Sequence, residues 1–174
     1  MRTVELPDPS LVLLIGAAGA GKSTLAARLF DPDEVLSSDA FREKVSGDAA
    51  NQRATRAAFE RLHRELATRL LAGRLTVLDA TNLERSARLA GIARARAAGV
   101  PVTAIVLDLP PTVVLARNAA RTERVVDPAV VRRHLAAVRT TVDDGRLEAE
   151  GLDAIVVLAT PEAVETLRIE RRRV

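Results

Sequence analysis

The sequence predicts an α/β fold in which a parallel β-sheet is flanked by helices on both faces. Short apolar runs alternate with segments of helical periodicity along the 174 residues, which is typical of strands joined by crossover helices. A glycine-rich turn also lies between one of these apolar runs and a helical pattern. The expected strands cover residues of about 11–16, 35–37, 75–79, 102–108 and 154–158.

Two long helices are expected between these strands, each with one apolar stripe. The first covers about 53–71, and its outer face pairs Glu65 with Arg69 four residues later. The second begins at Asp127, a good N-cap, and Pro128, a good first helical residue, and runs for about twenty residues. The stripes comprise Phe59, Leu62, Leu66 and Leu70 in the first helix and Val131, Leu135 and Val138 in the second.

Composition indicates one compact domain over residues 1–174. Hydrophobic residues make up 48% of the chain, which is enough for one well-packed core. A chain of 174 residues is short for two domains. No apolar run approaches the length of a membrane-spanning helix, and the first residues lack the apolar core of a signal peptide. We therefore expect a cytoplasmic protein with no membrane partner. With no cysteine and two histidines, a zinc site is not expected and Mg²⁺ is the predicted metal.

The net charge of +3 is modest, and nearly all basic residues are arginine. The tail, RIERRRV, is expected to be a solvated basic end or a boundary before another domain. Aromatic residues make up 2% of the chain, so the stacking platforms common in single-strand binders are nearly absent. Any contact with bases would therefore use arginine planes or aliphatic side chains.

The segment 16–23, GAAGAGKS, satisfies the spacing G-x-x-x-x-G-K-[ST]. Glycines let the backbone N–H groups of such a loop turn toward a triphosphate, and the following helix directs its positive end at the same anion. Lys22 can then reach the β- and γ-phosphates, and the Ser23 hydroxyl is the expected Mg²⁺ ligand. The segment predicts a site for ATP or another NTP, with binding residues Gly16, Gly19, Ala20, Gly21, Lys22, Ser23 and Thr24.

The segment VLSSDAFR begins in the second expected strand and continues past its carboxyl end, where open α/β sheets bind their ligands. Asp39 would there accept the proton of an attacking hydroxyl, and Arg42 follows one helical turn later. An equally weighted alternative is that Ser38 or Asp39 only caps the helix AFREKV.

The segment LTVLDATN ends the third expected strand with Asp79. We call the glycine-rich segment 16–23 the phosphate loop. A carboxylate beside this loop resembles the Walker B arrangement, which holds Mg²⁺ or its waters. Asp79 could instead pair with Arg42 and direct its guanidinium fork toward an acceptor phosphate. For Thr81 and Asn82 we expect a cap on the helix beginning at Glu84.

The segment RNAARTERVVDP places Arg117, Arg121 and Arg124 at spacings of four and three residues, on one helical face. We interpret the segment of about 117–135 as a lid whose arginines close over the triphosphate and offset charge on the transferred group. The alternative is a solvated basic face. His63 and His134 are expected to be ordinary packing or surface residues.

A set of motifs occurs in a fixed order between about 11 and about 157: GAAGAGKST, SSDAFR, LDATN followed by SAR, RNAARTER and VRRH. In order and spacing this set resembles the kinase domain of bacterial polynucleotide kinase/phosphatase repair proteins and, more distantly, phage polynucleotide kinase. The resemblance covers nearly the whole chain and is more specific than the loop alone. It implies a P-loop kinase fold with a helical lid, in the 5′-hydroxyl polynucleotide kinase family of P-loop phosphotransferases.

The resemblance implies an enzyme that transfers the γ-phosphate of ATP or another NTP to the 5′-hydroxyl end of RNA or DNA in nucleic-acid repair. It implies that Ser23 holds Mg²⁺ and that Asp39 is the general base on the hydroxyl. Arg42 would contact the phosphate on the 3′ side of the acceptor nucleotide, and Val130 would lie against its terminal base. The implied catalytic residues are Lys22, Asp39, Arg42, Arg117 and Arg121, with Arg124 also on the nucleotide phosphates and Asp79 also at the acceptor.

Two other functions stay open. A P-loop kinase of a small-molecule hydroxyl would use the same loop, base and lid, but a neutral substrate offers Arg42 no phosphate. An ATP-dependent switch is less favoured, because the sequence lacks an N-K-x-D guanine motif and continues after Asp79 as Ala-Thr-Asn. The chain lacks phosphatase and ligase modules, so it is expected to be a stand-alone kinase or an excised domain, with other repair proteins as candidate partners. Its oligomeric state stays open.

Overall fold

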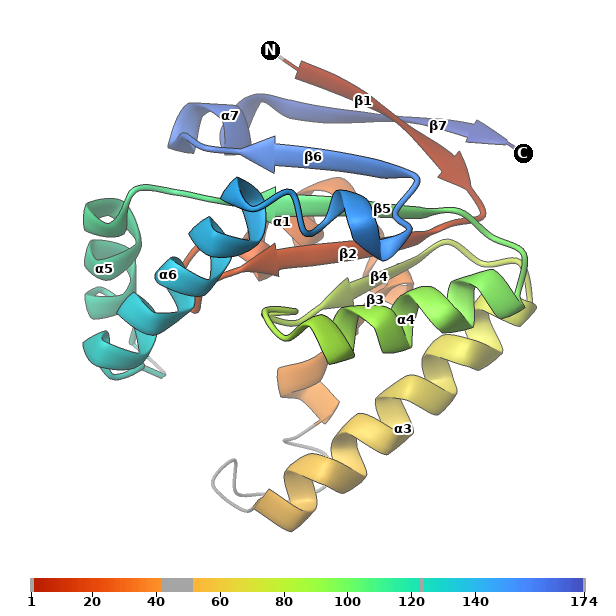
Figure 1. The fold of residues 1–174 in the computed structure, drawn as a ribbon, viewed down its shortest axis with the longest axis horizontal. Helices are drawn as coiled ribbons and strands as arrows, with labels where there is room; N and C mark the ends of the chain where they lie inside the picture. The colour runs from red at the N-terminus through yellow and green to blue at the C-terminus, as the bar shows by residue number, and fades with distance from the viewer. Residues whose placement is uncertain (1, 42–51, 123, 174) are drawn as a thin grey trace.

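The computed structural model describes residues 2–41, 52–122 and 124–173. Within these ranges the main sheet has five parallel strands in the order β3-β4-β2-β5-β6 (Figure 1). The predicted parallel α/β architecture is confirmed, and each predicted strand is present. The predicted residue Arg42 lies outside the described residues. The strands are β2 (Leu11–Gly16), β3 (Val35–Ser37), β4 (Thr76–Asp79), β5 (Val102–Leu107) and β6 (Ala154–Leu158).

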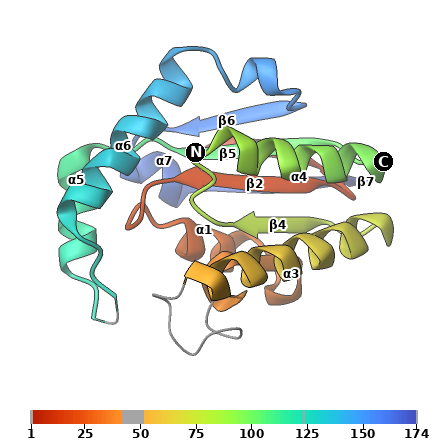
Figure 2. The same cartoon turned by 60° about the horizontal axis from the view of Figure 1, so that its bottom comes forward.

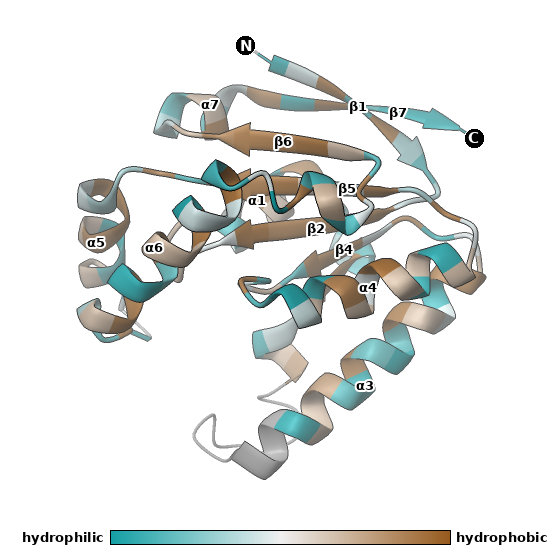
Figure 3. Cartoon of the chain, viewed as in Figure 1, coloured by the Kyte–Doolittle hydropathy of each residue, from teal (hydrophilic) through white to brown (hydrophobic). Residues whose placement is uncertain are grey.

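Helices cover both faces of this sheet, as predicted (Figure 2). Successive side chains of a strand point to opposite faces, so Leu13 packs in one hydrophobic cluster and Leu14 in another. Each fully buried leucine stabilises the fold by roughly 1.5–3 kcal/mol. Figure 3 shows that the strands of the main sheet carry mostly hydrophobic colours, whereas α3 alternates between hydrophobic and hydrophilic residues. The covering helices are α1 (Lys22–Leu29) on one face and α3 (Gln52–Leu71) and α4 (Arg85–Ala97) on the other.

Helix α5 (Pro111–Ala119) lies beyond the carboxyl ends of the strands, and α6 (Pro128–Asp143) runs from there over the sheet, where it packs against β2 and β5 (Figure 1). The predicted N-cap is confirmed, because the Asp127 carboxylate accepts a hydrogen bond from the Ala129 N–H at 2.7 Å. Helix α6 has 16 residues rather than about twenty. Its predicted inward side chains, Val131, Leu135 and Val138, are all buried.

The two ends of the chain form a second sheet, which the sequence analysis did not predict. Strand β1 (Arg2–Asp8) pairs in parallel with β7 (Leu167–Arg173), which follows the short helix α7 (Pro161–Thr166). Leu6 and Leu167 are fully buried in the main hydrophobic core. The predicted basic tail, 168–174, forms most of β7 where it is described. Its arginines are exposed, as predicted, but Ile169 packs partly against the core.

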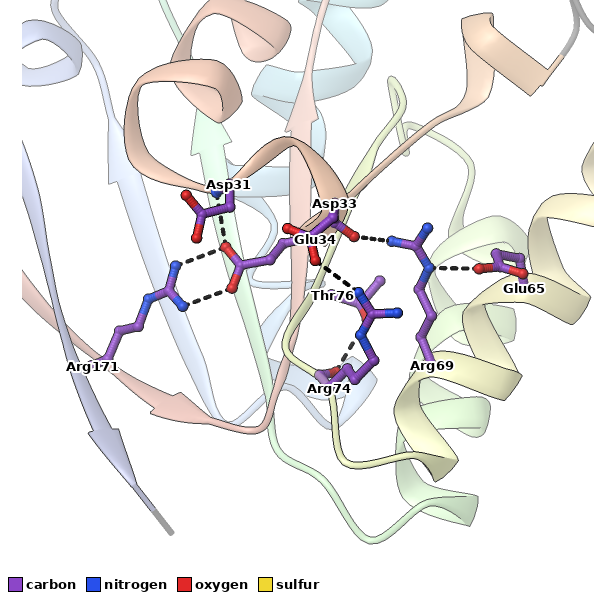
Figure 4. A network of polar contacts seen from close by, with 8 residues as sticks. All are labelled: Asp31, Asp33, Glu34, Glu65, Arg69, Arg74, Thr76 and Arg171. Atoms are coloured by element: carbon purple, nitrogen blue, oxygen red, sulfur yellow. Dashed lines mark hydrogen bonds and ion pairs between the residues drawn. The ribbon is translucent and has the colours of Figure 1, made fainter.

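Arginines also fix this second sheet to the rest of the fold (Figure 4). Arg171 of β7 donates two hydrogen bonds to the Glu34 carboxylate, each of 2.7 Å, and such a bidentate pair has strong geometric specificity. Glu34 belongs to a 3₁₀ turn, Pro32–Glu34, just before β3. Nearby, the predicted pair of Glu65 and Arg69 is confirmed at 2.7 Å.

A buried ion pair holds the turn after β4. Arg88 is 2% exposed, and its guanidinium donates to both carboxylate oxygens of Glu150 at 2.7 and 2.6 Å. Glu150 ends a second 3₁₀ turn, Glu148–Glu150. The same guanidinium donates to the backbone carbonyls of Asn82 and Leu83. Every charge in this pair is thus hydrogen-bonded, as the low-dielectric interior requires.

No helix in the described part of the chain is long and apolar enough to span a membrane.

We predict that Arg88→Ala lowers the free energy of unfolding by about 3–5 kcal/mol, because it removes both hydrogen bonds that Arg88 donates to the buried Glu150 carboxylate. Urea denaturation measures this change. Arg85→Ala is the matched control, since Arg85 lies 3.9 Å from the same carboxylate but is 63% exposed, and it should cost less than about 1 kcal/mol. Arg88→Met with Glu150→Leu should recover much of the loss. Equal stability of the Arg88 and Arg85 variants would contradict the prediction.

Candidate active site

A pocket of about 830 Å³ opens at the carboxyl ends of the main-sheet strands. It is bordered by the loop between β2 and α1, by the residues that follow β3 and β4, and by α5, α6 and the segment between them. This is the edge at which open α/β sheets bind ligands. The predicted site residues that line it are Gly19, Gly21, Lys22, Ser23, Thr24, Asp39, Asp79, Arg117, Arg121, Arg124 and Val130.

The phosphate loop has the backbone geometry that its glycines predict. Gly19 and Gly21 have φ angles of 84° and 97°, in the left-handed region that favours glycine. Helix α1 starts directly after Gly21 without a side-chain cap, so its first N–H groups remain available to an anion. Gly16 and Ala20 do not line the pocket; Gly16 packs so closely on β5 that an added Cβ would lie 3.2 Å from the Leu107 Cβ.

Lys22 is buried at the base of the pocket. Its Nζ donates hydrogen bonds to the carbonyls of Gly16 and Ala17 at 3.0 and 2.9 Å. Burial lowers the pKa of Lys22 to about 8, although Asp79 and Asp39 oppose that shift. A triphosphate bound over the loop would place anionic oxygens beside the buried ammonium and favour its charged form.

Ser23 and Asp79 meet across the start of α1. The Ser23 hydroxyl donates to Asp79 Oδ2 at 2.7 Å. Burial raises the pKa of Asp79, while this hydrogen bond and Lys22 oppose the rise. Hydroxyl and carboxylate oxygens are ligands that Mg²⁺ prefers, and substrate phosphates and waters usually complete its coordination. The pair therefore fits Mg²⁺ and supports the Walker B interpretation of Asp79.

Asn82 does not cap α4, and the predicted cap at this residue or Thr81 is wrong. The N-cap of α4 is Glu84, with no side-chain hydrogen bond. Asn82 is buried, and its amide donates to the carbonyls of Leu14 and Leu78 at 2.7 and 3.3 Å. The carbonyl of Thr81 accepts from the Gly16 N–H at 3.1 Å. The turn thus joins β4 to β2 and fixes Asp79 against the phosphate loop.

Asp39 lies at the mouth of the pocket with a side chain that is 64% exposed. Its carboxylate forms an ion pair of 3.6 Å with Arg124, which comes from the segment between α5 and α6. At the start of the helix after β3, the Ser37 hydroxyl accepts from the Ala40 N–H at 3.4 Å. A carboxylate from one wall of the pocket therefore meets an arginine from the opposite wall.

Helix α5 packs directly on the phosphate loop. A Cβ added at Gly19 would lie 3.2 Å from both the Asn118 Cβ and the Val114 carbonyl oxygen. Arg117 donates to the Ala20 carbonyl at 3.3 Å. The three predicted arginines all line the pocket. They do not share one helical face, because α5 ends at Ala119 and only Arg117 belongs to it.

Sequence reasoning missed several residues at or behind this pocket, and two of them join its elements. Asn118 is fully buried, and its amide forms hydrogen bonds of 2.7 and 3.1 Å with the backbone carbonyl and N–H of Val126. It thereby closes the segment that carries Arg124. His134 lines the pocket and accepts a hydrogen bond from the Ala18 N–H at 3.4 Å. Both contacts join residues from different elements, so no local pattern could have predicted them.

We predict that Gly19→Ala weakens ATP binding by at least about tenfold, because its Cβ would push α5 from the loop in addition to straining the backbone. Isothermal titration calorimetry with ATP and Mg²⁺ measures the affinity. Gly99→Ala is the matched control, since Gly99 also has a positive φ (69°) but would place its Cβ in open space. The Gly99 variant should lower the stability of the fold and leave ATP affinity unchanged. Unchanged binding by the Gly19 variant would contradict a tight contact between loop and helix.

Comparisons with known proteins agree with this geometry. A family model described as an AAA domain (AAA_33) matches residues 11–144. Among solved structures, a chain of the Pnkp1/Rnl/Hen1 RNA repair complex has a TM-score of 0.68 and 20% identity. That alignment covers 80% of this chain but 47% of the repair chain, so this protein spans about half of that chain.

Two similar structures have chains of comparable length. A sugar kinase from Janibacter sp. HTCC2649 has a TM-score of 0.61 and 20% identity, with 90% of this chain and 91% of that chain covered. A gluconokinase from Sinorhizobium meliloti 1021 has a TM-score of 0.57 and 18% identity, with 92% and 90% covered. A search of curated proteins found no match. The chain belongs to the AAA_33 family of AAA domains, and its fold is that of the P-loop kinases.

Proposed function

We propose that this protein transfers the γ-phosphate of ATP or another NTP to the 5′-hydroxyl end of RNA or DNA, as in the healing of broken ends. One observation carries the proposal. The carboxylate of Asp39 shares a single pocket with the phosphate loop and with the arginines of the α5–α6 side. A base, a phosphate-binding loop and cations that face each other are the parts that phosphoryl transfer needs.

The donor nucleotide would bind over the phosphate loop. Lys22 and the first N–H groups of α1 would contact its β- and γ-phosphates. Ser23 and Asp79 would hold Mg²⁺, which neutralises charge on these phosphates when it is bound. Arg117 and Arg121 would meet the charge on the transferred group from the opposite wall.

The acceptor hydroxyl would approach from the mouth of the pocket, beside Asp39. Its oxygen forms a bond to the γ-phosphorus while the bond from that phosphorus to the β–γ bridging oxygen breaks, and the proton passes to the Asp39 carboxylate. Before the acceptor binds, Arg124 would hold this carboxylate in place through their ion pair of 3.6 Å. The products are a 5′-phosphorylated end and the nucleoside diphosphate.

A polynucleotide acceptor is favoured by the motif set that surrounds this chemistry. SSDAFR, LDATN and RNAARTER all contribute residues to the pocket. A nucleic-acid strand offers a phosphate on the 3′ side of its terminal nucleotide, which Arg42 would contact. Partner proteins with phosphatase or ligase activity would complete end repair, and one of the similar structures belongs to an RNA repair complex. The sugar kinase and the gluconokinase of the same fold make a small-molecule hydroxyl the competing acceptor.

We predict that labelled γ-phosphate passes from ATP, with Mg²⁺, to short RNA or DNA strands that bear a 5′-hydroxyl. The labelled product is separated by gel electrophoresis and counted. Strands that already carry a 5′-phosphate are the control and should accept no label. Intact ATP binding without labelling of either nucleic acid would overturn the polynucleotide acceptor and move the proposal to small-molecule hydroxyls.

We also predict that Asp39→Asn lowers turnover by about 10²–10⁴-fold, the usual contribution of a positioned general base. ATP affinity should change little, because Asp39 lies at the mouth of the pocket and not in the phosphate loop. Asp33→Asn is the control, since Asp33 pairs with Arg74 and neither residue lines the pocket. Turnover is measured with the acceptor that the first assay identifies, and near-normal turnover by the Asp39 variant would remove its catalytic role.

A further inference from the structure

His134 lies at the wall of the pocket, on a helix that packs against the sheet. It lies one helical turn after Val130 on α6, and both residues line the pocket. The neighbouring stripe of α6 is buried in the core. Arg139, further along the helix, forms an ion pair of 3.1 Å with Asp108, the residue that directly follows β5. The imidazole therefore extends from a helix that is fixed to the sheet on both sides of it.

The contact of His134 with the phosphate loop is compatible only with a neutral imidazole. Nδ1 accepts a hydrogen bond of 3.4 Å from the Ala18 N–H, and a ring nitrogen can accept only while it carries no proton. The imidazole must then be neutral, with its proton on Nε2. The phosphate loop thus has a backbone N–H fixed by a side chain from α6, two residues after Gly16.

The charges around His134 favour this neutral form. Burial lowers the pKa of His134 below its ordinary value of 6.5, and the cations Lys22 and Arg133 lower it further. Arginines outnumber carboxylates in the pocket, so the surroundings disfavour a second positive charge. The other charged residues of the pocket lining are Arg28, Asp39, Asp79, Arg117, Arg121, Arg124 and Glu165.

We propose that His134 is a positioning residue for the bound nucleotide. It holds the Ala18 end of the phosphate loop in its binding conformation through Nδ1, and it does so only as the neutral imidazole. An anchored loop loses less conformational freedom when the triphosphate binds, which strengthens binding without a direct contact. The proposal rests on the proposed function only in that a nucleotide binds over this loop.

Three substitutions separate the acceptor at Nδ1 from the bulk of the ring. In His134→Asn the amide oxygen can replace Nδ1, in His134→Gln the amide reaches the position of Nε2 instead, and in His134→Ala neither acceptor remains. Near neutral pH, we expect the Ala and Gln variants to bind ATP and Mg²⁺ about tenfold more weakly than the wild type and the Asn variant to stay within about twofold of it. His63→Asn is the control, because His63 packs beside Phe59 on α3 and does not line the pocket.

The test is isothermal titration calorimetry with ATP and Mg²⁺ over a range of pH, with thermal unfolding of each variant to verify folding. Below pH 6.5, wild-type affinity should fall relative to that of His134→Asn, because protonation of Nδ1 removes the acceptor in the wild type alone. Equal affinities of the Ala variant and the wild type, equal affinities of the Gln and Asn variants, or parallel pH profiles would each overturn the proposal. Wild-type protein that binds no ATP would instead overturn the proposed function, and no acceptor is needed to see the difference.

Discussion

The charge pair of Arg88 and Glu150 lies beside the active site without belonging to its pocket, and the geometry of that pocket depends on it. Two ions removed from water must hydrogen-bond to each other, and their remaining N–H groups need further acceptors. For Arg88 these acceptors are the carbonyls of Asn82 and Leu83. The Asn82 side chain then binds the carbonyl of Leu14. A desolvated guanidinium thus sets the position of Asp79 relative to the loop that holds Ser23.

The opposite wall of the pocket is built onto the loop in the same way. The missing side chain of Gly19 lets α5 approach within contact of the loop backbone, and Asn118 closes the segment that follows α5. His134 adds a contact from α6. The arginines therefore face the loop in a preformed arrangement, and little reorganisation is needed to place cations around a bound triphosphate.

Sequence patterns were sufficient where the structural cause is local. The strands of the main sheet are continuous apolar runs, and the phosphate loop is a short motif with its own backbone geometry. The sheet of β1 and β7 was missed because β7 ends in a run of charged residues, which is typical of a solvated tail, and because each strand's partner is at the other end of the chain. Asn82 was misassigned as a cap for a related reason: the partner of its shorter hydrogen bond, Leu14, is 68 residues away. Arg42 lies outside the described residues, so its role stays a prediction.

The parallel pairing of the first and last strands has a mechanical consequence. Because β1 and β7 run in the same direction over seven residue pairs, the N-terminus and the C-terminus leave this small sheet at opposite ends (Figure 1). Tension between the two termini would therefore pull the strands along their length and load all of the hydrogen bonds between them at once. A protein held by its ends would resist in shear and would not unzip one hydrogen bond at a time.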